Sequence, residues 1–300
     1  GIYIEDSDYN TVEDNSFTGS EDKGVYVFRS DNNEIDDNTI SDNDENGIEL
    51  YQSDSNTFYN NTVMDNDGNN EVYLSGSGEN VFHNNTILGR LRGGHSSIIK
   101  NNNISDSIYI ESDDNLISNN IIGYIWSDYG DSNTISNNII NGRIGLDEAD
   151  DNIINNNTII GGILLYDGSN GNLITNNTIK DNDGNGITVY SNSNTISGNT
   201  ISGNDDDGIY LTGSDSNTIF NNTIKDNGGS GIYLSGSDSN TISNNTISGN
   251  EDYEIYLGSG SNDNILIGSV SDVYVSSNSD LTIKNYLTIQ VKLSDDLVNG

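Results

Sequence analysis

Residues 240–250 read NTISNNTISGN, and residues 231–234, shortly before them, read GIYL. In the first stretch Asn240 opens the motif, a second Asn follows five residues later, and isoleucines stand two and seven residues after the opening Asn. In the second stretch Ile232 and Leu234 alternate with other residues, as in a strand with one buried face. Together the two stretches indicate short strands separated by tight turns rich in Asn and Gly.

The motif recurs along the chain at intervals of 17 to 24 residues, which are longest near both ends and shortest in the middle. Each repeat holds about three short strands and no helical stretch. The sequence therefore predicts an all-β fold, a right-handed single-stranded parallel β-helix of about 12–13 coils. The residues that open the repeats are Asn10, Asn33, Asn56, Asn80, Ser97, Asn115, Asn133, Asn152, Asn172, Asn194, Asn217, Asn240 and Asn264.

The recurring Asn residues have a physical explanation in stacked coils. A side-chain amide both donates and accepts, so each Asn can bond the coils on either side, and Asn tolerates the left-handed backbone of tight turns. A further Asn, ten residues after the opening one, is present in the long repeats and missing from the short ones. We therefore expect the middle coils to lack one turn, which leaves a waist or shallow cleft.

The chain is strongly acidic, with 47 Asp and Glu against 10 Lys and Arg and a net charge of −37. Nucleic acid is excluded as a partner, because phosphate binding needs basic surfaces. No apolar run reaches the length of a membrane span. Without Cys there are no disulfides and no thiolate sites. Such a charge favours surroundings rich in screening cations.

The N-T-I-x-x-N-x-I and G-I-Y-L motifs resemble the repeats of the NosD-like and carbohydrate-binding-and-sugar-hydrolase families, over residues 1 to about 268. The resemblance implies a β-helix domain at residues 1–268 and an extracellular or cell-surface location. Residues 269–300 differ, with alternating Leu287, Ile289 and Val291, and are predicted to form a C-terminal β extension. In related surface proteins such a segment leads into an immunoglobulin-like module.

Two turns of the form D-x-D-x-N-G, which begin at Asp42 and Asp181, and two near-variants, which begin at Asp65 and Asp205, are candidate calcium sites. Calcium prefers clustered oxygen ligands, and the Gly permits a sharp turn. The alternative is a solvated acidic turn without metal, and calcium is the one cofactor that we expect. The candidate ligands are Asp42, Asp44, Asp65, Asp67, Asp181, Asp183, Asp205 and Asp207.

Two further sets of residues could contact glycans. Tyrosines at equivalent positions either stabilise the strands by stacking or offer flat surfaces to sugars; they are Tyr3, Tyr26, Tyr73, Tyr109, Tyr210, Tyr233 and Tyr256. Sequons for N-glycosylation, to be used on an exported protein, occur at Asn60, Asn84, Asn103, Asn156, Asn176, Asn221 and Asn244.

Arg90, Arg92, His95 and Lys100 form a basic group in the short repeats and are the weak candidates for catalysis by a polysaccharide lyase. The alternative is a patch of salt bridges that offsets neighbouring acids. Paired carboxylates for a hydrolase cannot be singled out among 47 acids. We expect the chain not to be an enzyme.

Three functions follow from these observations. The first is a structural stalk or filament on a cell surface, stabilised by cations, whose partners are other copies of itself or other domains of a longer protein. The second is an adhesin or carbohydrate-binding module that uses the tyrosines. The third is a polysaccharide lyase or hydrolase.

Overall fold

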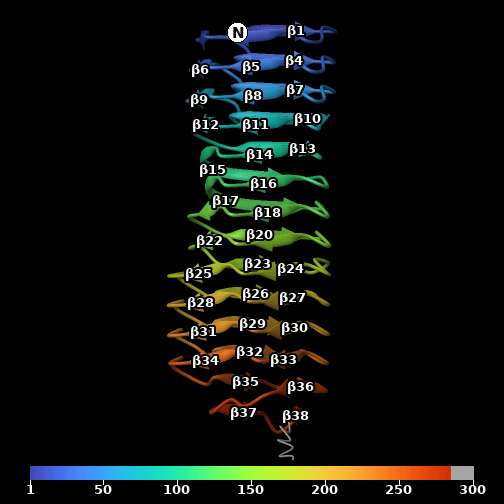
Figure 1. Ribbon diagram of the computed structural model, residues 1–300, viewed down its shortest axis with the longest axis vertical. Coiled ribbons are helices and arrows are strands. Elements are labelled where there is room, and N and C mark those ends of the chain that lie inside the picture. The colour runs from blue at the N-terminus through green and yellow to red at the C-terminus, as the bar shows by residue number, and fades with distance from the viewer. Residues whose placement is uncertain (285–300) are drawn as a thin grey trace, which may run out of the picture.

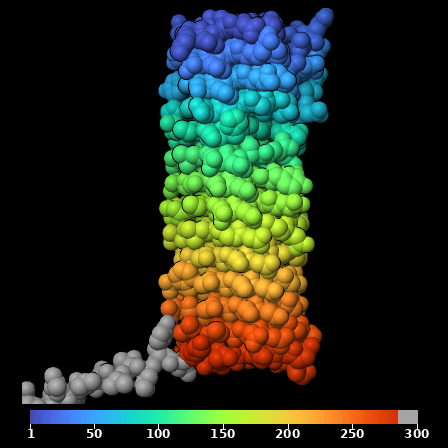
Figure 2. Space-filling model, turned by 90° about the vertical axis from the view of Figure 1, so that its right-hand side faces the viewer, coloured from blue at the N-terminus to red at the C-terminus, as the bar shows by residue number. Residues whose placement is uncertain are grey.

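The computed structural model describes residues 1–284 and confirms the predicted parallel β-helix (Figure 1). Every strand pair is parallel and joins successive coils, so the coils stack into a rod whose layers are visible in Figure 2. Between residues 1 and 284 there is no helix, and so none that is long and apolar enough to cross a membrane. Each coil has three faces, numbered here by the order in which the chain meets them.

Face 1 holds the G-I-Y-L strands. It consists of β1 (Ile2–Glu5), β4 (Val25–Phe28), β7 (Ile48–Tyr51), β10 (Val72–Gly78), β13 (Leu91–His95), β20 (Ile144–Asp147), β23 (Ile163–Leu165), β26 (Ile187–Val189), β29 (Ile209–Thr212), β32 (Ile232–Ser235), β35 (Ile255–Leu257) and β37 (Val273–Val275).

Face 2 is a separate 14-stranded sheet. It consists of β2 (Thr11–Glu13), β5 (Glu34–Asp36), β8 (Thr57–Tyr59), β11 (Val81–His83), β14 (Ile98–Lys100), β16 (Leu116–Ser118), β18 (Thr134–Ser136), β21 (Ile153–Asn155), β24 (Leu173–Thr175), β27 (Thr195–Ser197), β30 (Thr218–Phe220), β33 (Thr241–Ser243), β36 (Asn264–Ile267) and β38 (Leu281–Lys284).

Face 3 shares a 24-stranded sheet with face 1, because β15 (Asn103–Ile110) and β17 (Ile121–Asp128) run across the corner between them. Its other strands are β3 (Ser16–Thr18), β6 (Thr39–Ser41), β9 (Thr62–Met64), β12 (Thr86–Ile87), β19 (Ile139–Ile140), β22 (Thr158–Ile159), β25 (Thr178–Lys180), β28 (Thr200–Ser202), β31 (Thr223–Lys225) and β34 (Thr246–Ser248).

Each strand sends alternate residues inward, where aliphatic side chains of successive coils stack on one another. In the middle coils Ile135, Ile140 and Ile144 are fully buried, one on each face of the same coil. Burial of one such side chain contributes about 1.5–3 kcal/mol. The even spacing of these residues explains how a chain that is only 31% hydrophobic sustains a continuous core.

The Asn residues form ladders along the rod, as predicted. In the ladder between faces 2 and 3, the backbone N–H and the side-chain amide of Asn120 both donate to Oδ1 of Asn138, at 2.9 and 3.0 Å. Asn138 bonds Asn157 in the same way, at 2.9 and 3.0 Å. Each buried amide is therefore satisfied by the neighbouring coil, which favours one register over all others.

The corner between faces 3 and 1 changes in length along the rod. In the long coils it is a loop held by a third Asn ladder, whereas in the middle coils β15 and β17 pass the corner without a loop. The left edge of the rod in Figure 1 is set back at these coils. The upper part of this ladder ends where Asn66 donates to the carboxylate of Glu71 at 2.6 Å. The structure thus agrees with the expected waist.

The stacking continues beyond residue 268, the predicted end of the β-helix. Strand β37 pairs with β35, and β38 pairs with β36, so the solenoid reaches at least residue 284. The expected immunoglobulin-like start, with Leu287, Ile289, Val291 and Leu293, falls in residues 285–300, outside the described residues.

Candidate functional site

One outward position on face 1 forms a column along the rod, because the register aligns the middle residue of each G-I-Y-L strand. All seven tyrosines predicted from the sequence lie in it. The rings of Tyr210 and Tyr233 are 5.2 Å apart, and those of Tyr233 and Tyr256 are 4.6 Å apart. From one end to the other the column reads Tyr3, Tyr26, Glu49, Tyr73, Arg92, Tyr109, Trp126, Gly145, Leu164, Thr188, Tyr210, Tyr233, Tyr256 and Tyr274.

Trp126 and Tyr274 also lie in the column but were not predicted, although each follows an aliphatic residue at the start of its pairing register, Ile125 and Val273. That signal was sufficient to find them. The longest interruption of the aromatic members is at Gly145, Leu164 and Thr188, where the side chains are not aromatic. Glu49 and Arg92 are single interruptions of the part from Tyr3 to Trp126. The column is therefore two aromatic stretches with a gap between them.

A pocket of about 570 Å³ lies beside the lower aromatic stretch, between face 1 and the loops that precede it. One of its lining residues is Asp207, a half-buried residue in the loop before β29. Oδ1 of Asp207 accepts a hydrogen bond of 2.6 Å from the backbone N–H of Ser230 in the next coil. The remaining lining residues are Asn185, Asp206, Tyr210, Gly228, Gly229, Tyr233, Asp252, Tyr253 and Tyr256.

The electrostatics of this pocket favour a protonated carboxyl group. Burial raises the pKa of Asp207 from its ordinary 3.8 to about 6, and the nearby carboxylates of Asp206 and Asp252 add to the rise, while the hydrogen bond from Ser230 opposes it. Asp207 was predicted to be a calcium ligand. A raised pKa is the property of a side chain that can donate a proton near neutral pH, while calcium binding by Asp207 stays a prediction.

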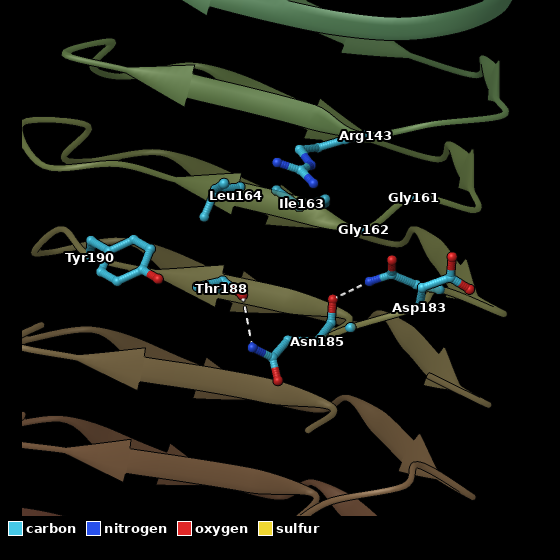
Figure 3. Close-up of a pocket in the computed structure, with 11 residues that line it drawn as sticks. Arg143, Gly161, Gly162, Ile163, Leu164, Asp183, Asn185, Thr188 and Tyr190 are labelled. Atoms are coloured by element: carbon cyan, nitrogen blue, oxygen red, sulfur yellow. Dashed lines mark hydrogen bonds between the residues drawn. The ribbon is translucent and has the colours of Figure 1, made fainter. Parts of the chain in front are cut away.

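A second pocket, of about 260 Å³, lies at the gap in the column, two to three coils away along the same face (Figure 3). Its floor is the coil of β23, in which Gly161 and Gly162 have no side chains to fill the space. A Cβ on Gly162 would lie 2.7 Å from Nδ2 of Asn182, so the glycine is required by close packing. The other lining residues are Arg143, Ile163, Leu164, Asp183, Gly184, Asn185, Thr188 and Tyr190.

The four basic residues proposed for catalysis lie on two faces of the rod and at one corner. Arg92 lies in the face 1 column between Tyr73 and Tyr109 and forms two hydrogen bonds of 2.9 and 2.8 Å with Glu111. Lys100 lies on face 2 in β14.

The other two basic residues are also placed separately. Arg90 donates to Ser107 at 3.3 Å at the corner before face 1, and His95 ends β13 beside Gly78. The alternative of local pairing therefore describes Arg92, while a catalytic role for these residues stays a prediction.

The calcium candidates other than Asp207 are exposed in their turns. Asp42 and Asp65 stack on adjacent coils as expected, since the N–H of Asp42 donates to the backbone oxygen of Asp65 at 3.1 Å. Asp181 is paired with Lys180 at 3.1 Å. Across residues 1–284, no group of three or more acidic or histidine side chains is arranged to hold a metal ion. Calcium binding stays a prediction.

The seven predicted glycosylation sites all have exposed side chains. Six of them occupy left-handed turn positions, with φ between 52° and 59°, whereas Asn103 begins β15. Their use stays a prediction too.

Comparison with known proteins shows what the fold is similar to. The periplasmic alginate epimerase AlgG has a similar structure, with a TM-score of 0.58 and 15% identity over 88% of this chain and 78% of that one. A double mutant of AlgG gives a TM-score of 0.64 and 14% identity with the same coverage. No curated protein sequence matches the chain significantly.

These structures correct the expectation that the chain is not an enzyme. That expectation treated the repeat as purely structural, but the fold that the chain shares is one on which a polysaccharide-modifying enzyme is built. At 14–15% identity the likeness concerns the fold, so the reaction must be argued from the site. The model of the right-handed beta helix region matches residues 1–94, 90–205 and 161–288. The chain therefore belongs to the right-handed beta helix family.

Proposed function

We propose that this chain is an exported enzyme that hydrolyses a polysaccharide at the Asp207 pocket. The observation that carries the proposal is a half-buried carboxyl group near two further carboxylates, in a pocket lined by four tyrosines. Enzymes that cleave glycosidic bonds use a carboxylic acid of raised pKa as proton donor and a second carboxylate close by. Tyrosine rings offer flat apolar surfaces for sugar rings and hydroxyl groups that bond their polar edges.

In this proposal Asp207 donates a proton to the oxygen of the bond that breaks. Its pKa of about 6 keeps a usable fraction protonated near neutral pH, whereas a carboxyl at the ordinary 3.8 would be almost fully ionised. Because the N–H of Ser230 holds Oδ1, Oδ2 is the oxygen that carries the proton. The carboxylate of Asp206 or Asp252 stabilises the positive charge that develops on the sugar, or activates the attacking water.

The extracellular part of the proposal is supported by the similar epimerase, which is periplasmic. The polysaccharide alternative also replaces the filament as the leading interpretation, since the similar fold is that of an enzyme and four tyrosines line the same pocket as the carboxyl group of raised pKa. A carbohydrate-binding module without turnover is the second candidate. It is favoured by the aromatic column, which extends along the rod beyond any one pocket.

The test is to incubate the purified chain with a panel of acidic and neutral polysaccharides and to measure new reducing ends. Asp207→Asn is expected to abolish cleavage, while Asp205→Asn, an exposed residue of the same loop outside the pocket, retains it. Wild-type rates in Asp207→Asn would contradict the proposed acid. Products with a new carbon–carbon double bond would identify a lyase, and binding without cleavage would identify the second candidate.

A further inference from the structure

The pocket at the gap in the aromatic column contains a positive charge in an otherwise acidic protein. Arg143 forms its upper wall, and the hydroxyl groups of Thr188 and Tyr190 line the opposite side. Figure 3 shows the guanidinium on the side of Leu164, with Asp183 at the other end of the pocket. A guanidinium faced by hydroxyl donors is suited to an anionic oxygen group.

The ion pairs of the described residues do not include Arg143. Among residues 1–284, the cations in ion pairs are Lys23, Arg29, Arg92, Lys180 and Lys225. Four cations of residues 1–284 are absent from these pairs, namely Arg90, Lys100, Arg143 and Lys284, and Arg143 is the one that lines this pocket. Its charge is thus available to a ligand.

The Arg143 pocket and the Asp207 pocket belong to one surface. Asn185 lines both, and its side-chain amide donates to Thr188 at 3.2 Å, which places it between them. The register aligns the strands after Arg143 and Asp207 three coils apart, which is about 14 Å at the strand spacing of a sheet. A linear chain that runs along the rod can therefore reach both.

We propose that Arg143 binds an anionic substituent, a carboxylate or a sulfate, of a polysaccharide that extends along face 1 to the Asp207 pocket. The inference rests on the proposed function only for the identity of the ligand as a polysaccharide. It assigns a substrate class, an acidic polysaccharide, and a specificity-determining residue that lies outside the reacting centre. The charge of the protein as a whole repels such a polymer, so a local cation is needed to hold it.

The single tryptophan of the chain provides a direct measurement. Trp126 pairs in register with Gly145, and its ring covers that glycine, where a Cβ would lie 2.5 Å from a ring carbon. Arg143 is two residues before Gly145, or about 7 Å along the strand. A ligand seated at Arg143 is therefore expected to change the tryptophan emission.

The experiment titrates the full chain with oligogalacturonate, with a sulfated galactan oligosaccharide and with a neutral cello-oligosaccharide of equal length, and follows this emission. We expect saturable binding of one or both acidic probes and a loss of about tenfold or more in Arg143→Gln. Arg29→Gln removes the same charge far from the pocket and retains wild-type affinity. Comparing the two acidic probes tells carboxylate from sulfate.

Two results would overturn the inference: equal affinity for the neutral probe, or unchanged affinity in Arg143→Gln. Asp207→Asn separates this inference from the proposed function. If that variant binds the acidic probe normally and the wild type cleaves nothing, the anion site is supported and the proposed hydrolysis is contradicted. If the wild type cleaves only neutral polysaccharides, the proposed hydrolysis is supported and the anion site is contradicted.

Discussion

Replacement of Asp207 by Asn is expected to raise the free energy of unfolding and to abolish the proposed cleavage of polysaccharide. The change keeps the shape and the acceptor oxygen, because in the coil before it Oδ1 of Asn185 accepts the same bond from the N–H of Asp207, at 2.9 Å. It removes a charge whose burial raised the pKa from 3.8 to about 6. This rise in the pKa corresponds to a free energy of about 3 kcal/mol. Because the side chain is partly exposed, we expect a stabilisation of about 1–2 kcal/mol.

The sign follows from the raised pKa. A carboxyl that binds its proton more tightly in the folded state favours folding below its ordinary pKa of 3.8, and this contribution is lost as the pH rises through about 6. The stabilising effect of Asp207→Asn should therefore be complete at about pH 8 and vanish at about pH 3.

Urea unfolding followed by circular dichroism at both pH values measures this difference. Asp205→Asn, an exposed change in the same loop, serves as the control and should leave the unfolding free energy nearly unchanged. If Asp207→Asn is no more stable than the wild type at high pH, or keeps its added stability at low pH, then the pKa of Asp207 is not raised by burial.

Three further outcomes follow from the packing. Ile140→Ala should lower the unfolding free energy by about 2–5 kcal/mol in urea titrations, since its fully buried side chain leaves a cavity between coils. Asn138→Ala should cost about 1–3 kcal/mol, because bonds to two neighbouring coils are lost, whereas Asn137→Gly, at a φ of 58°, should change the midpoint little. Gly162→Ala should weaken acidic-probe binding measured by tryptophan emission, because the new Cβ displaces Asn182 at the edge of the pocket.

The fold was predictable because its causes are periodic. The ladder position of Asn120 and Asn138 and the buried aliphatic or aromatic positions recur from coil to coil, so a single sequence contains many copies of the same pattern. The tyrosine column followed from the same alternation, and Trp126 and Tyr274 could have been included by applying it at every coil.

The candidate site was less predictable because its residues depart from the repeat pattern. Asp207 occupies a position that Asn holds at Asn185, and only the burial of the loop distinguishes it from exposed acids such as Asp42. Arg92 and Arg143 look alike in the sequence, yet the first is paired with an acid and the second lines a pocket. These differences depend on where the loops run in space.

The bonds between coils have a consequence for how this molecule can be altered. Because the ladder amides of each coil bond the adjacent coils, a whole coil is a unit that can be removed or duplicated with the ladders closing again across the junction. The distance between Arg143 and Asp207 can thus be changed in steps of about 4.8 Å, the spacing of one strand. Excision of the coil that contains Gly162 would bring the two side chains closer by one such step. A series of such variants could measure the spacing of charged groups along a bound polymer.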